Sequence, residues 1–60
     1  MFVVKTYKGR ELSIVIEDKE EAAEFANETN MPCRVHDAVT NEVVYDVAQN
    51  EFSAFYRTIV

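Results

Sequence analysis

Cys33, His36 and Asp37 are the residues whose types could do chemistry, because a thiol, an imidazole and a carboxylate close in sequence can form a metal site or a nucleophilic group. The stretch that holds them, CRVHDA at 33–38, is typical of a β-strand. On a strand, Cys33 and His36 differ by an odd number of positions and therefore point to opposite faces. We therefore expect Cys33 to be a small buried hydrophobic residue and His36 to be a hydrogen-bonding group.

Other catalytic signatures are missing from the sequence. Ser13 and Ser53 lack the flanking glycines of a nucleophile elbow, and the one glycine of the chain cannot build a phosphate-binding loop. One cysteine and one histidine cannot supply the ligands of a structural zinc site. A chain of 60 residues also leaves little interior volume for a pocket that would shift carboxylate pKa values. We expect no enzyme activity, no catalytic residues, no cofactor and no metal.

The most distinctive stretch is acidic and reads EDKEEAAEFANETN at 17–30. Asp18 can cap a helix at 18–30 by accepting a hydrogen bond from the backbone N–H of Glu21, and the Glu21 side chain can close a capping box. Asn30 and Pro32 mark the end of this helix. Its carboxylates follow one side of the helix in two neighbouring rows over about 16 Å. This acidic surface consists of Glu17, Glu20, Glu21, Glu24 and Glu28.

The acidic surface has two interpretations. It could dock a basic partner, such as a nucleic-acid-binding protein that it occupies by mimicking a phosphate backbone, or it could be a solvated face that keeps a small protein in solution. Like charges at i and i+4 cost a little stability, which indicates a use. A cluster of opposite sign, Lys5, Lys8 and Arg10, could contact the acidic helix of a second copy, pair with Glu11 and Glu17, or stay solvated.

The elements that position these residues begin with a hairpin at 1–17. Strands are predicted at 2–7 and 10–17, with a two-residue turn at Lys8 and Gly9, where the only glycine supplies a positive φ. The period of two places one aliphatic set on the face of the sheet that the helix covers. This set consists of Leu12, Ile14 and Ile16.

The helix should contact that face through a narrow stripe in which Phe25 is the main anchor. The other members of the stripe are Ala22, Ala26 and Thr29. A second hairpin at 33–47 should have strands at 33–38 and 42–47 around a turn in which Asn41 is left-handed. The period of two puts Val43, Tyr45 and Val47 on one face of the last strand, opposite Glu42, Val44 and Asp46.

The segment 48–60 is rich in aromatic residues. Its apolar residues recur at helical spacing, with Asn50 as a candidate cap, and this spacing fits a helix better than a strand. The segment could close the core of its own domain, form the contact of a symmetric dimer, or line a groove for a partner. The residues that could serve assembly are Phe52, Phe55, Tyr56 and Ile59.

These elements predict one small α+β domain, an antiparallel sheet in the order β-β-α-β-β with a C-terminal helix. A net charge of −5 argues against direct binding of nucleic acid or an anionic membrane. The single cysteine favours a reducing cytoplasm, and neither a membrane-spanning run nor a signal peptide is visible. A core this small often gains support from a partner chain, so we expect a homo-oligomer.

The sequence therefore favours a cytoplasmic interaction module that binds or inhibits a basic macromolecular partner through its acidic helix. The alternative is a structural subunit that assembles through the aromatic segment and makes no use of the acidic face.

Overall fold

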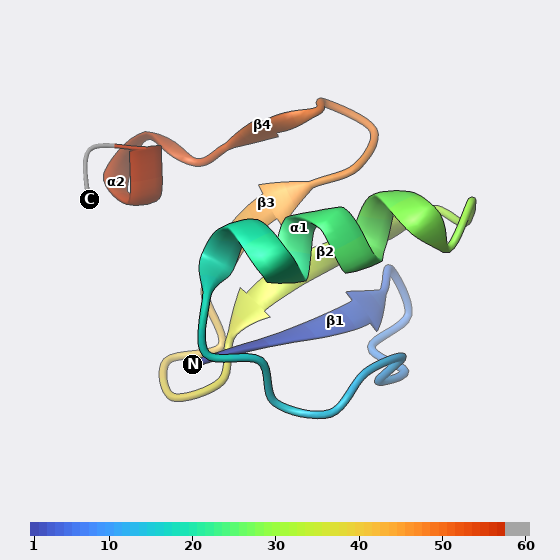
Figure 1. Cartoon of the computed structure of the whole chain (residues 1–60), viewed down its shortest axis with the longest axis horizontal. Coiled ribbons are helices and arrows are strands. Elements are labelled where there is room, and N and C mark those ends of the chain that lie inside the picture. Colours follow the sequence, from blue (N-terminus) through green and yellow to red (C-terminus); the bar gives the residue numbers. More distant parts are fainter. Residues whose placement is uncertain (58–60) are drawn as a thin grey trace.

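The computed structural model describes residues 1–57, in which one antiparallel sheet carries a helix on one of its faces (Figure 1). The sheet has the strand order β1-β2-β3-β4. The α+β class and the antiparallel sheet are confirmed. The predicted element order is not matched, because the observed order is β-α-β-β-β-α. The elements are β1 (Phe2–Thr6), α1 (Lys19–Glu28), β2 (Cys33–Asp37), β3 (Val43–Asp46), β4 (Glu51–Phe52) and α2 (Ala54–Arg57).

The segment after β1 follows the edge of that strand without forming a strand of its own, so the predicted strand at 10–17 is wrong. It contacts β1 by two isolated bridges, Phe2 to Ile16 and Lys5 to Glu11. Four residues lie between Glu11 and Ile16 but only two between Phe2 and Lys5, so the segment carries two extra residues. Ser13 Oγ accepts the hydrogen bond from the Val4 N–H at 3.0 Å, which replaces a backbone acceptor of a regular ladder.

This insertion changes which side chains reach the core. Leu12 and Ile16 pack against the core as predicted, whereas Ile14 is 85% exposed. The turn also differs from the prediction, because the Gly9 N–H donates to the Thr6 carbonyl and the Thr6 N–H donates to the Arg10 carbonyl. Gly9 adopts a φ of 95°, which fits the left-handed position of a three-residue hairpin loop.

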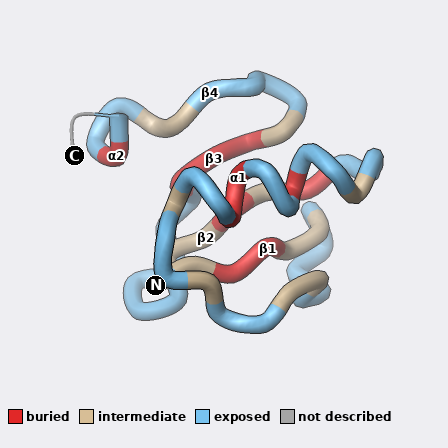
Figure 2. The backbone as a smooth tube through the Cα atoms, in the orientation of Figure 1, coloured by how far each residue is buried: buried red, intermediate tan, exposed pale blue. Residues whose placement is uncertain are grey.

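Helix α1 begins after Asp18, which caps it as predicted, although its side chain accepts from the Glu20 N–H rather than from Glu21. Asn30 ends the segment with a φ of 56°, as predicted. Ala22 and Ala26 are fully buried. The third buried residue of α1 is Ala23, whereas Phe25, which was expected to be buried, is 38% exposed. Phe25 is therefore not the anchor of α1, whose buried residues are the three alanines. Figure 2 shows buried and exposed stretches alternating along α1.

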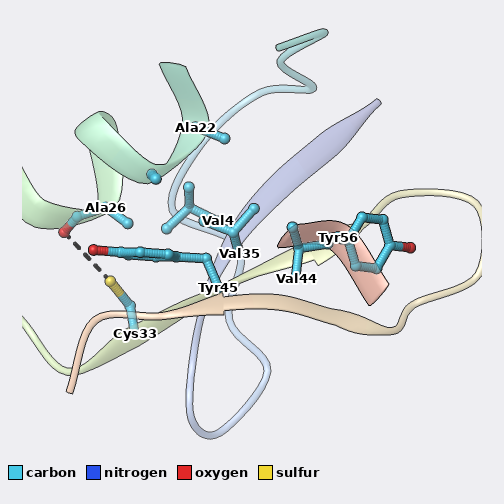
Figure 3. Close-up of a cluster of buried hydrophobic side chains, with 9 residues drawn as sticks. Val4, Ala22, Ala26, Cys33, Val35, Val44, Tyr45 and Tyr56 are labelled. Atoms are coloured by element: carbon cyan, nitrogen blue, oxygen red, sulfur yellow. Dashed lines mark hydrogen bonds between the residues drawn. The ribbon is translucent and has the colours of Figure 1, made fainter. Parts of the chain in front are cut away.

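The core lies between the α1 alanines and one face of the sheet (Figure 3). Val4, Val35 and Tyr45 are paired neighbours on adjacent strands and point to this face. Val44 joins them because the pairing between β2 and β3 shifts between Val35 and His36, which leaves Val44 as the extra residue of a bulge. The predicted alternation in β3 is therefore wrong at Val44, which is buried beside Tyr45, whereas Val43 is 39% exposed.

The C-terminal segment is only partly helical. A turn at 47–50, in which Asn50 has a φ of 55°, leads into the two-residue strand β4, so the helix predicted across 48–60 is wrong up to residue 53. Helix α2 follows, and its Tyr56 is 6% exposed within the core cluster. Ile59 lies outside the described residues.

The close approach of α1 to the sheet generates a stability prediction. Ala26→Leu should lower the free energy of unfolding by about 1–3 kcal/mol, because a larger side chain at this fully buried position must displace the helix. Glu24→Leu, on the exposed side of the same helix, is the matched control and should change stability by less than about 0.5 kcal/mol. Urea unfolding measures both variants, and equal stabilities would contradict this packing.

Candidate functional site

The acidic surface is fully outside the core. Glu20, Glu21, Glu24 and Glu28 lie on α1, and Glu17 lies just before it; all five are exposed. The opposite side of α1 is the buried alanine face, so the helix presents its carboxylates away from the sheet. Within residues 1–57, none of these carboxylates forms an ion pair. The surface is therefore available to a partner molecule.

This surface also holds the entire net charge of the protein. Residues 17–28 contain six acids and one base, which gives −5. The remaining five acids and five bases cancel. A charged ligand therefore meets a molecule with one strongly negative side, where the electrostatic potential favours basic groups.

The basic cluster of the hairpin is not neutralised by the acids that the sequence suggested. Lys8 and Arg10 are exposed, and within residues 1–57 neither forms an ion pair with Glu11 or Glu17. Lys5 is half-buried, and its Nζ donates to Asn41 Oδ1 at 3.1 Å. The cluster is thus a second charged surface, of opposite sign to α1.

The second face of the sheet, here called the open face, points away from α1. Cross-strand pairs place Val3, His36 and Val43 in one row and Lys5, Arg34 and Asp46 in the next. A shallow pocket of about 270 Å³ lies beside these rows. Its charged lining residues are Lys5, Glu11 and Asp37, and its apolar ones include Val3, Ile14 and Val15.

Asp46 organises the polar part of the open face, which the sequence analysis did not identify. Its carboxylate accepts hydrogen bonds from Tyr7 Oη at 2.7 Å, Arg34 Nε at 3.1 Å and the Ala48 N–H at 2.9 Å. The Arg34 guanidinium also lies 4.1 Å from the centre of the Tyr7 ring. Burial raises the pKa of Asp46, but these hydrogen bonds outweigh it, so the pKa lies below its ordinary value. The sequence signal that could have identified this cluster is the pair of opposite charges, Arg34 and Asp46, on two predicted neighbouring strands.

A second carboxylate holds the C-terminal segment. Tyr56 Oη donates to Asp37 Oδ2 at 2.8 Å, while the Val39 N–H donates to Asp37 Oδ1. The Val39 N–H and then the Tyr56 hydroxyl lower the pKa of Asp37. Burial, together with the bond to Asp37, raises the pKa of Tyr56. The hydroxyl and the carboxylate thus form a polar contact between α2 and the end of β2.

The aromatic residues predicted for assembly are used unequally. Phe52 packs against Tyr45, with ring centres 5.0 Å apart, and lies below the Lys19 ammonium at 5.0 Å. Lys19 also donates to the Tyr56 carbonyl. Phe55, at 65% exposure, stands out from the surface and contacts the Tyr56 ring at its edge. Phe52 and Tyr56 therefore close the core of their own chain, whereas the Phe55 side chain lies mostly at the surface.

Cys33 and His36 are separated as their spacing predicts. The Cys33 thiol is buried below α1 and donates to the Ala26 carbonyl at 3.5 Å (Figure 3). His36 lies in the row of the open face, and its Nδ1 is 3.1 Å from the Asn41 carbonyl oxygen. The two side chains therefore do not form a common site.

No protein-family model, curated protein or solved structure matches this chain. Within residues 1–57, no three His, Cys, Asp or Glu side chains are grouped so that they could hold a metal ion. The helices in the same part of the chain fall short of the length and hydrophobicity of a bilayer-spanning segment. The acidic surface and the open face, with the geometry described above, are the surfaces considered for function.

The carboxylate contacts generate a pH prediction. Asp37 and Asp46 have lowered pKa values, so their contribution to the free energy of unfolding is present above the unfolded value of about 3.9 and lost as the pH falls through the folded values. The Tyr7 hydroxyl, whose pKa is raised first by its hydrogen bond to Asp46, and Tyr56 act in the opposite direction. Their contribution is present below about 10 and lost as the pH rises through the folded values.

Urea unfolding across the pH range should therefore show stability that falls at both ends. Asp46→Asn should be less stable at neutral pH and should flatten the acid side of the profile, whereas Tyr56→Phe should flatten the alkaline side. An acid side with an unchanged slope in both Asp37→Asn and Asp46→Asn would contradict this assignment.

Proposed function

We propose that this protein is a small acidic protein-binding module, which binds or inhibits a macromolecular partner with a basic surface through α1. The observation that carries the proposal is the concentration of the whole net charge in residues 17–28, on the exposed side of a helix fixed to the sheet by alanines. A fixed helix loses little conformational entropy when a partner binds, which favours recognition by its outer surface.

The chemistry of the surface defines the partner. Carboxylates along one side of a helix complement a row of lysine or arginine side chains, and such rows occur on proteins that bind nucleic acid. The same charge repels phosphate backbones and anionic lipids, so the partner is a protein. The proposal includes a reducing cytoplasm, supported by the single cysteine, and it assigns no catalytic role to any residue.

A second candidate function is that of an assembly subunit, in which the aromatic segment forms the contact and the acidic surface has no role. The exposure of Phe55 supports this candidate. The burial of Tyr56 and the packing of Phe52 against Tyr45 leave little further aromatic surface for it within the described residues. We therefore favour the acidic surface.

The test measures binding of a lysine- and arginine-rich helical peptide by fluorescence anisotropy. The triple variant Glu20→Gln, Glu24→Gln, Glu28→Gln should weaken binding about tenfold at low salt, because three exposed charge pairs are worth roughly 0.2–1 kcal/mol each. High salt should reduce the affinity of the unmodified protein toward that of the variant.

The matched control is Glu11→Gln, Glu42→Gln, Glu51→Gln, which removes the same charge from exposed positions outside α1. It should keep most of the affinity. Equal losses in the two triple variants would show that only the net charge matters and would reject a docking surface on α1. An unchanged affinity in both would favour the assembly function.

A further inference from the structure

We propose that a second copy of this chain is one partner of the acidic surface, with α1 of one copy docked on the β1 hairpin of the next. The inference rests on the proposed function, because it names an occupant for the same carboxylates. The receiving surface, here called the hairpin surface, combines Lys5, Ile14 and Val15, which line one pocket, with the exposed bases Lys8 and Arg10 of the loop after β1.

The hairpin surface has an apolar part that the fold leaves uncovered. The two extra residues between Glu11 and Ile16 turn Ile14 out of the core. Ile14 and its neighbour Val15 are 85% and 51% exposed. Both line the pocket of about 270 Å³, whose charged lining residues are Lys5, Glu11 and Asp37. The bases that face a partner are therefore Lys5 at the pocket and the exposed Lys8 and Arg10 of the loop after β1. Neighbouring exposed aliphatic side chains of this kind mark interaction surfaces.

The acidic surface offers a matching apolar group. Phe25 remains 38% exposed and lies one helical turn from both Glu21 and Glu28. A contact of Phe25 with Ile14 and Val15 would bury apolar surface on both copies. It would also bring the neighbouring glutamates toward the lysines and the arginine of the hairpin.

Charge and length support this pairing. Residues 1–16 contain three bases and one acid, whereas residues 17–28 carry −5, and Lys8 and Arg10 form no ion pair within the described part of the chain. The ten residues of α1 extend over about 15 Å and the five residues of β1 over about 16 Å, so the helix can lie along the hairpin.

The symmetry of the contact follows from the fold. Val3 and Lys5 belong to rows on the open face, whereas the acidic surface lies on the outer side of α1, beyond the other face of the sheet. The proposal assigns one such contact, not two, to each pair of copies, which makes the interface heterologous. Such an interface continues from copy to copy as a chain unless the rotation closes a ring.

The test is sedimentation velocity of the full chain over a range of concentrations. The unmodified protein should form species larger than a dimer as concentration rises. Lys8→Glu/Arg10→Glu and Glu24→Lys/Glu28→Lys should each weaken association about tenfold or more. An equimolar mixture of these two variants should recover it, because each then meets a complementary surface.

Glu42→Lys/Glu51→Lys, which makes the same charge change as Glu24→Lys/Glu28→Lys at positions outside α1, is the control for that variant and should still associate. Ile14→Asp should also lose association, because it removes the apolar contact with Phe25 of the next copy. Circular dichroism should show that every variant is folded. A monomer at all concentrations, a limiting symmetric dimer, or folded variants that do not recover association in the mixture would each overturn the proposal. In that event the proposed function still stands if the unmodified protein binds the basic peptide. The Lys8→Glu/Arg10→Glu variant distinguishes self-association from partner binding, because it should lose self-association and keep peptide binding.

Discussion

The close contact between the α1 alanines and the sheet is the constraint on which the rest of the structure depends. A chain of this length can fill only a shallow interior, and here the fully buried residues are small, with Val4, Val35 and Val44 as the largest aliphatic ones. Alanine at Ala22 and Ala26 lets α1 lie close to β1 and β2, the strands that carry Val4 and Val35. Phe25, on the same helix, is left at the surface.

The same constraint separates the charges of the molecule. Because the inner side of α1 is occupied by alanine, its carboxylates are confined to the outer side, where solvent offsets their mutual repulsion. The buried acid, Asp46, is compensated instead by three donors from Tyr7, Arg34 and Ala48. Charge that stabilises the fold therefore lies on the open face, and charge available for binding lies on α1.

The sequence predicted those features that depend on local chemistry. The Asp18 cap, the positive φ at Gly9, Asn30 and Asn41, and three of the strands follow from residue types and short spacings. The alternation of side chains between the two faces of a strand gave wrong predictions where the backbone departs from a regular ladder, at Ser13 and at Val44. A bulge is fixed by contacts between distant strands, so single-sequence alternation cannot locate it. The contacts of Asp46 could not be predicted either, because they depend on the register between β2 and β3, which a single sequence does not show.

The helix predicted for 48–60 is wrong up to residue 53 for a related reason. Phe52 and Tyr56 fit a helical spacing, but Phe52 gains more by pairing beside Tyr45 in the sheet, while Tyr56 enters the core from a separate short helix. Tertiary packing overrides a weak local preference in so short a segment. The acidic positions were predicted correctly as exposed because helix geometry alone decides them once the alanine face is buried.

The central claim is that the outer side of α1 is the surface that meets a partner. Titration of isotope-labelled protein with a lysine- and arginine-rich peptide, followed by backbone amide NMR shifts, tests it most directly. The account predicts that the largest shifts fall on residues 17–28 and vanish at high salt. Shifts concentrated instead on β4 and α2, with residues 17–28 unmoved, would contradict it.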